Sequence, residues 1–298
     1  MNKLITIPTS PNFVTSEFSL LRAVGATSSP FSGKQRTQEF DLVAWEGTAT
    51  LPPMNRETAV NWQSFLMECV GTKNHFHFID PDAKTPQGTY DGGYLAGEIR
   101  VNSGTNVTAA TLTFAASTGT ISSTSDVFDG LAVNDFITVS GANNTENNGT
   151  FKITTKTSDS IVIVDAALIT ESSTANCKIS QNIKGSEALS LAAATNSATG
   201  TIKKGDYLAI FDGAATTSNR VQLVMATSDA TETSQSGSPN HYSVAIQPKL
   251  RNDLTDTHLV GFSSTHNQSR FRLADNRINW SANQVSLYGI TVAFTEVI

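Results

Sequence analysis

The sequence predicts a mainly β fold with a single α-helix, and three observations support this prediction. Short stretches rich in Val, Ile, Thr and Phe recur along the 298 residues, separated by Gly, Pro, Asn and Asp, which is typical of strands joined by turns. Only one stretch, residues 55–70, has the spacing of an amphipathic helix. Charged residues make up 15%, against roughly 25% in typical domains, so Thr, Ser and Asn dominate the polar surface.

The predicted helix lies between two strands in residues 45–80. Pro52-Pro53 ends the first strand, because proline cannot donate to a ladder, and Asn55 is the expected N-cap of a helix over residues 56–70. Gly71 follows where a left-handed residue commonly ends a helix. The side chains expected on the core face recur at intervals of three and four: Ala59, Trp62, Phe65, Leu66 and Cys69.

Residues 74–79 predict a strand in which Phe76 and Phe78 share one face and His75 and His77 share the other. Prolines break residues 4–31 into short extended pieces, as in an arm that lies over another surface. Residues 29–40 are predicted to be a loop, and residues 40–51 one or two strands. At the C-terminus, residues 285–294 predict one long strand with Gly289 at a bulge, which completes a sheet with residues 40–51.

The middle of the chain differs in composition, with many Thr, Ser and Asn and few aromatic residues. Residues 99–181 predict a small all-β module, in which Asn148-Gly149 is the strongest hairpin signal. Residues 182–251 resemble it, since LTFAASTGTI at 112–121 matches LSLAAATNSATGTI at 189–202, which predicts two related modules in tandem. The expected domains are therefore residues 1–98 plus 252–298, then 99–181, then 182–251.

Composition excludes several functional classes. A net charge of −6 and a pI near 5.3 argue against a general nucleic-acid binder. No apolar run approaches the 18 residues that span a bilayer, and the N-terminus has no signal-peptide core. Cys69 and Cys177 could form a disulfide, but buried free thiols are the favoured interpretation. No cofactor or metal motif is found, so we expect no cofactor.

Several polar groups have both a chemical and a structural interpretation. His75 and His77, with Asp80 and Asp82, could hold a metal ion, or they could be outward-facing strand residues followed by an Asx turn. Asp80, Asp82 and Asp91 could act in acid–base chemistry, bind calcium or simply form turns. A basic cluster could pair with carboxylates of a neighbouring subunit or be a solvated strand face: Arg270, Arg272 and Arg277. A set of aromatic residues could line a ligand groove or pack as core: Trp45, Trp62, Phe65, Phe76 and Phe78.

Three stretches of the N-terminal region together resemble the distal tail proteins of tailed bacteriophages and related minor tail proteins: SPFSGKQRTQEF at 29–40, WEGTATLPPMNRETAVNWQSFLMECVG at 45–71, and the aromatic strand that ends in DPD at 80–82. The resemblance continues in KKGDYLAIF at 203–211, in IQPKLR at 246–251, and in the closing FRLADNRINW and SLYGITVAFTEV. Residues 99–181 depart from the shorter pattern and look like an inserted module.

The resemblance implies a structural virion protein without enzymatic activity, made in the host cytoplasm and located in the phage tail. It implies a ring, usually a hexamer, that joins the tail tube to the hub or tip and to fibres or receptor-binding proteins in a baseplate or tail tip. The implied fold is a tube-like belt domain, a β-sandwich or split barrel with the flanking helix. We expect the ring interface on the arm, the 29–40 loop and the edge strand: Phe13, Phe18, Leu20, Phe31, Lys34, His75 and His77.

Two alternatives belong to other classes. A carbohydrate-binding or receptor-binding tail protein would hold sugars on its two β modules, although these offer few exposed aromatic candidates beyond Tyr207 and Tyr242. A glycan hydrolase would need two carboxyl groups roughly 5–10 Å apart, for which Asp206 and Asp212, or Asp80 and Asp82, are the nominees.

Overall fold

A computed structural model describes residues 2–89, 98–101, 106–193, 199–213, 219–235, 238–255 and 258–298 of the chain. The fold is mainly β, with 48% of residues in strands and 7% in helices, which confirms the predicted class. The chain forms two compact units, residues 1–84 with 268–298 (unit 1) and residues 85–267 (unit 2). Each unit is described separately below.

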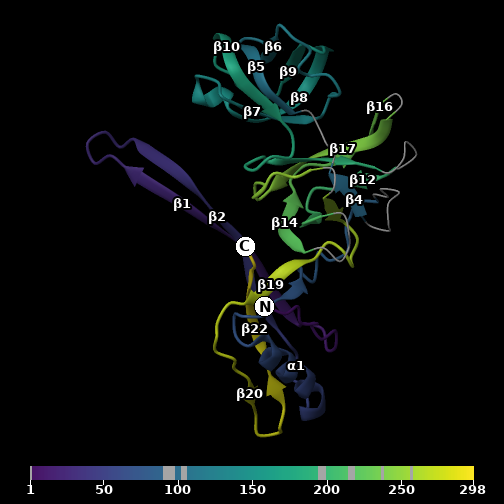
Figure 1. Cartoon of the computed structure of the whole chain (residues 1–298). Coiled ribbons are helices and arrows are strands. Elements are labelled where there is room, and N and C mark those ends of the chain that lie inside the picture. Colours follow the sequence, from purple (N-terminus) through teal and green to yellow (C-terminus); the bar gives the residue numbers. More distant parts are fainter. Residues whose placement is uncertain are drawn as a thin grey trace. The chain divides into compact units, whose positions relative to one another are not determined.

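Unit 1 is built on a five-stranded antiparallel sheet, shown in Figure 1. Its strands lie in the order β1 (Thr15–Ser28), β2 (Gln35–Thr50), β22 (Thr291–Glu296), β19 (Ser269–Leu273) and β3 (Phe76–Phe78). The C-terminal strand β22 pairs with residues 46–50 of β2, so the two ends of the chain meet in one sheet. The described residues of unit 1 thus form this sheet, one helix and a short two-stranded pair within residues 281–289, and the expected sandwich or split barrel is not complete within them.

Helix α1 (Arg56–Cys69) has the expected N-cap, because the Asn55 side chain accepts a hydrogen bond of 2.9 Å from the Thr58 N–H. Its C-cap is Val70, with φ 50°, so the left-handed conformation begins one residue before Gly71. The five residues placed on the core face by periodicity are the buried residues of the helix. Trp62 contacts Phe13 at 5.3 Å between ring centroids, and Phe65 contacts Phe76 at 5.2 Å.

The C-terminal segment differs from the expected single strand. Tyr288 and Gly289 form the short strand β21, which pairs with β20 (Ser281–Ala282), while β22 starts at Thr291. The backbone of Tyr288 bonds with Met54, and the Ile290 carbonyl accepts from Leu51 N–H. These bonds to the segment before α1 split the run into two strands, where the sequence predicted a bulge.

The first part of unit 2 is a closed six-stranded barrel, in the order β10-β5-β6-β9-β8-β7 (Figure 1). Its strands are β5 (Asn106–Ala115), β6 (Thr120–Ser123), β7 (Phe136–Ser140), β8 (Gly149–Ser158), β9 (Ile161–Val164) and β10 (Glu171–Ser180). β7 and β8 form the expected hairpin, but residues 141–148 connect them, including a 3-10 turn (η1, Thr145–Asn147). Asn148-Gly149 therefore ends a longer loop and does not form a two-residue turn.

The second part of unit 2 is a seven-stranded sheet in the order β11-β4-β18-β13-β14-β17-β16. Its strands are β4 (Glu98–Val101), β11 (Ala188–Ala192), β13 (Tyr207–Phe211), β14 (Arg220–Ala226), β16 (Thr233–Gln235), β17 (Ser238–Gln247) and β18 (Leu259–Gly261); β12 (Thr201–Ile202) pairs with β15 (Ala230–Thr231). An additional pairing of β11 with β17 joins six of these strands into a closed circuit. Both parts of unit 2 thus contain a circuit of six strands, and that of the second part includes β4 and β18, which lie outside residues 182–251.

The boundaries of the units differ from the expected boundaries at residues 98 and 252. β4 and β18 pair with each other and with β11 and β13, so both belong to the sheet of unit 2. Cys69 and Cys177 are free and buried, as favoured, and burial raises the pKa of Cys69 to about 12 with a smaller contribution from Glu68. No helix among the described residues is long and apolar enough to cross a membrane.

Candidate functional site

The most distinctive surface of the molecule is the distal part of the β1–β2 hairpin, which consists of residues 20–45. Residues 35–45 of β2 lie beyond the pairing with β22, and among the described strands they pair only with β1. The distal hairpin therefore extends away from the sheet as a two-stranded ribbon (Figure 1). The sequence predicted a loop over 29–40, but the loop spans only residues 29–34, because β1 and β2 pair as far as Ser28 and Gln35.

Apolar side chains are exposed along the distal hairpin. Those with at least 44% of their surface exposed are Leu21, Val24, Phe31, Phe40 and Leu42. The sheet of unit 1 buries comparable side chains at its base, where the Phe18 and Trp45 rings stack at 5.2 Å. The ribbon thus carries apolar surface that the described chain leaves in solvent, which marks interaction sites in folded proteins.

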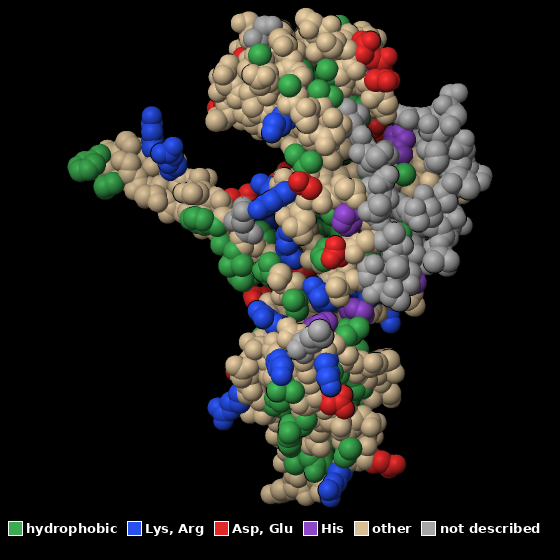
Figure 2. All heavy atoms as spheres, viewed as in Figure 1, with side chains coloured by type: hydrophobic (Ala, Val, Ile, Leu, Met, Phe, Trp, Pro, Cys, Tyr) green, Lys and Arg blue, Asp and Glu red, His purple; other side chains and the backbone are tan. Residues whose placement is uncertain are grey.

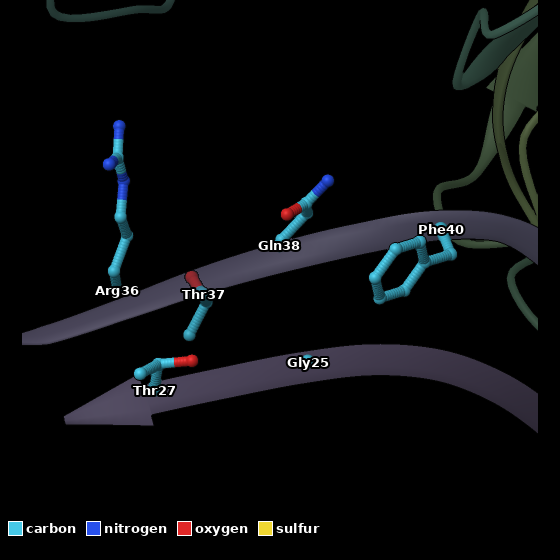
Figure 3. Close-up of a pocket in the computed structure, with 6 residues that line it drawn as sticks. All are labelled: Gly25, Thr27, Arg36, Thr37, Gln38 and Phe40. Carbon is cyan, nitrogen blue, oxygen red and sulfur yellow. The ribbon is translucent and has the colours of Figure 1, made fainter.

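The ribbon has a shallow hollow of about 550 Å³ on one face, shown in Figure 3. Gly25 forms its floor, and an added Cβ there would lie 3.3 Å from the Phe40 ring, so the ring lies against the glycine of the opposite strand. Arg36 and Gln38 line the same hollow, opposite Thr27 and Gly25 in the strand register. A partner on this face would meet an aromatic ring flanked by a guanidinium and an amide.

The tip of the hairpin, residues 29–34, is a tight turn that presents one aromatic ring. Ser29 N–H donates to the Lys34 carbonyl and Gly33 N–H donates to the Ser29 carbonyl, both at 2.9 Å. Gly33 has φ 65°, which glycine adopts without strain. The Phe31 side chain is 99% exposed. Lys34 and Arg36 are the only charged residues between 29 and 38, so the end of the hairpin is basic on an acidic chain (Figure 2).

The residues of the N-terminal arm that were expected at the ring interface pack within unit 1 instead. Phe13 packs against Trp62 and Phe78, and Phe18 packs against Trp45, so both rings belong to the interior of unit 1. Leu20 is half-buried opposite Trp45. Of the expected interface residues, Phe31 and Lys34 are exposed and lie at the tip of the hairpin. The arm interpretation failed because residues 15–28 form a continuous strand.

The edge strand β3 is covered by the N-terminal residues. Ile5 N–H donates to the His75 carbonyl at 2.7 Å, and His75 N–H donates to the Lys3 carbonyl at 3.0 Å. The backbone of His75 is therefore occupied within the same unit. Burial, assisted by the nearby Arg270 charge, lowers the pKa of His75.

His77, on the same face of β3, lines a groove of about 450 Å³ beside the N-terminal segment (the β3 groove). Its lining combines apolar and polar side chains, among them Pro8, Phe13, Phe78 and Pro81, and His77, Asp82 and Lys84. Asp82 N–H donates to Asp80 Oδ1 at 3.2 Å, which is the Asx turn anticipated from the sequence. Burial raises the pKa of Asp80.

Of the remaining carboxylates nominated for chemistry, the structure gives Asp206 a structural role. Asp206 accepts from Lys203 N–H at 2.8 Å, Gln87 N–H at 2.7 Å and Gly88 N–H at 3.0 Å, which occupies both of its oxygens. Asp91 lies outside the described residues. No group of three or more His, Cys, Asp or Glu side chains that could hold a metal occurs in the described ranges.

Sequence analysis missed two buried polar groups in unit 2. Glu171 in the barrel accepts hydrogen bonds from the backbone of Asn143 and Asn144 and from three side chains, those of Asn144, Asn147 and Thr174. Burial alone would raise its pKa, but these bonds outweigh it and hold the pKa at about 2. Asp135 and His241 form a buried pair at 3.1 Å. No sequence signal marked either group, because their partners lie up to 106 positions away.

Compared with models of known protein families, the chain matches none, and it matches no curated protein. The features that indicate a function are the geometry of the distal hairpin and the resemblance of particular stretches of sequence to phage tail proteins.

Proposed function

We propose that the chain is a structural subunit that assembles with copies of itself through the distal hairpin, as the ring at the end of a bacteriophage tail tube. The observation that carries the proposal is the ribbon itself. An isolated two-stranded ribbon is marginally stable in water, and this one exposes apolar side chains along its length. Contact with a second subunit would bury that surface and stabilise the ribbon.

The strand pairing supports assembly in a second way. β1 has 14 residues and pairs only with β2 in the described chain, so it presents a long edge. Exposed edges offer unpaired N–H and C=O groups to another strand, and proteins usually protect them with charges, proline or coverage. β1 contains no proline and only two charged residues, Glu17 and Arg22. An edge of this kind fits one that a neighbouring subunit covers.

In the proposed ring, unit 1 acts as the belt domain and unit 2 carries the outward modules. The partners that the resemblance implies are the tail tube protein, the hub or tip protein, and fibre or receptor-binding proteins. The low charged fraction fits this role, because charged side chains are depleted at the cores of interfaces. The proposed location is the virion tail.

The test is to shorten the hairpin without disturbing its base. Arg22 pairs with Val43, so residues 23–42 can be replaced by Asn-Gly, which closes a two-residue hairpin between the paired positions. We expect the full chain to form a ring and the shortened chain to be a folded monomer, as measured by light scattering and circular dichroism. A shortened chain that retains the mass of the ring would contradict the proposal.

A further inference from the structure

The two edges of the unit 1 sheet differ, and this difference suggests how one copy meets the next. β1 forms one edge and continues into the distal hairpin, whereas β3 forms the other edge beside the β3 groove. Because the two edges are different surfaces, a contact between them is not limited to a two-fold dimer. They can pair head to tail, which is the heterologous contact that closes a ring.

The shape of the hairpin tip fits the β3 groove. The groove holds about 450 Å³, within the range of roughly 300–1,000 Å³ seen for binding pockets and ample for one aromatic side chain. Its lining includes two prolines and two phenylalanines, the kind of surface on which an aromatic ring packs well. The tip presents Phe31 with 99% of its surface exposed, held forward by the backbone bonds of residues 29–34.

The basic hairpin tip differs in charge from the chain as a whole, whose formal net charge is −6. The groove is lined by one carboxylate and one ammonium group, Asp82 and Lys84, and Asp80 in the same turn adds a second carboxylate. The end of the hairpin contains Lys34 and Arg36 and no carboxylate between residues 29 and 38. A second copy of this acidic chain therefore suits the basic tip, and opposite charges at the rim of an interface favour a single orientation.

We propose that the hairpin tip of one copy docks in the β3 groove of the next copy, with Phe31 on the prolines and phenylalanines and Lys34 beside Asp82. This proposal rests on the proposed function, because it specifies the contact through which the ring closes. It makes the β3 groove an assembly site and assigns His77, which lines the groove, to that contact.

The test is a disulfide cross-link that leaves Phe31 in place. Ser32 and Thr9 are both exposed, one beside Phe31 at the tip and the other on the groove, and both native cysteines are buried. In the full chain carrying Ser32→Cys and Thr9→Cys, mild oxidation is expected to give a ladder of covalent oligomers on a non-reducing gel, which reductant returns to monomer. The matched control carries Ser32→Cys with Val285→Cys, whose side chain is 72% exposed on the β20–β21 ribbon, and should give no ladder.

Light scattering on the same samples separates the two proposals. A ring mass together with the ladder supports docking in the groove. A ring mass without the ladder, or an equal ladder from the control pair, overturns the docking in the groove. In that case the groove would bind another protein, and the proposed function would still hold. A full chain that remains monomeric overturns the proposed function and the docking with it. Phe31→Ser provides a second measurement, and we expect it to weaken assembly at least tenfold without changing the unfolding temperature.

Discussion

The β1–β2 hairpin and the β7–β8 hairpin are both antiparallel pairs, yet they treat their apolar side chains in opposite ways. In the barrel, β7 also pairs with β10 and β8 with β9, and the inward side chains of Ile137, Val139 and Ile153 are buried. The distal β1–β2 ribbon has no such neighbours in the described chain, and Val24 and Phe40 are about half exposed. Closure of the barrel buries its apolar side chains within one copy, whereas the ribbon leaves several of its apolar side chains exposed in the described chain.

This comparison divides the molecule into a part that is stable by itself and a part shaped for assembly. It can be tested by optical methods, because all three tryptophans, Trp45, Trp62 and Trp280, lie in unit 1. Tryptophan fluorescence therefore reports the unfolding of unit 1, while circular dichroism reports both units.

The largest expected effect on stability comes from Trp62→Ala, in the interior of unit 1. Trp62 is 1% exposed and contacts Phe13 and Phe65. Loss of a buried tryptophan destabilises a core by about 3–5 kcal/mol. Chemical denaturation should show the fluorescence transition, followed through Trp45 and Trp280, at a lower denaturant concentration, with the barrel transition unchanged.

The control for this change is Trp280→Phe, since Trp280 is 44% exposed and should alter the transition little. If Trp62→Ala shifted both transitions together, the units would not be independent and the comparison would fail.

The matching change in the barrel is Leu112→Ala. Leu112 is fully buried among the barrel strands, and large-to-small changes of this kind cost about 2–5 kcal/mol. The opposite result is expected here. The circular-dichroism transition of the barrel should occur at a lower denaturant concentration, and the tryptophan-fluorescence transition should not change. Assembly should be retained, because the distal hairpin is untouched.

A smaller effect, confined to acid pH, is expected from Glu171→Gln. The folded pKa of about 2 lies below the ordinary value of 4.5, so the ionised carboxylate stabilises the barrel above pH 4.5 and this contribution is lost as the pH falls toward 2. At pH 7 the variant should be less stable by about 2 kcal/mol, typical of hydrogen bonds to a charged group.

Unfolding midpoints measured between pH 2 and 7 distinguish this origin from simple loss of packing. The difference between wild type and Glu171→Gln should shrink as the pH falls through this range. A constant difference at every pH would show that the charge of Glu171 is not what stabilises the loop.

The smallest effect is expected from Glu39→Gln on the ribbon. Glu39 lies 3.9 Å from Arg22, and both side chains are 38% exposed, so solvent screens the pair. Exposed pairs contribute less than about 1 kcal/mol, and the fluorescence transition should hardly move. A shift comparable to that of Trp62→Ala would mean that polar pairs within the chain hold the ribbon, which removes its need for a partner.

Sequence analysis predicted the parts of the fold in which burial is local. The face of α1 could be identified because Trp62, Leu66 and Cys69 follow helical periodicity and one surface covers them all. β3 could be identified because Phe76 and Phe78 alternate with polar residues over a short span. In both cases the element packs against a single core, so the pattern of its own residues is enough to predict which of its faces is buried.

The candidate site was predicted only in part, for a physical reason. Phe31 and Lys34 were predicted at the ring interface and are exposed at the hairpin tip, but the strands on either side of them were not recognised in full. With apolar side chains exposed on the ribbon, the alternation that marks a half-buried strand is absent there. Phe13 and Phe18 were assigned to an interface because the core that buries them is completed by β3, β19 and β22, far away in sequence.

The most direct test of self-assembly through the distal hairpin is the mass of the full chain in solution, measured by light scattering over a range of concentrations, with negative-stain images of the same sample. The prediction is a closed ring near six times 31.7 kDa with an open centre. A mass of 31.7 kDa at every concentration, with no rings in the images, would contradict it.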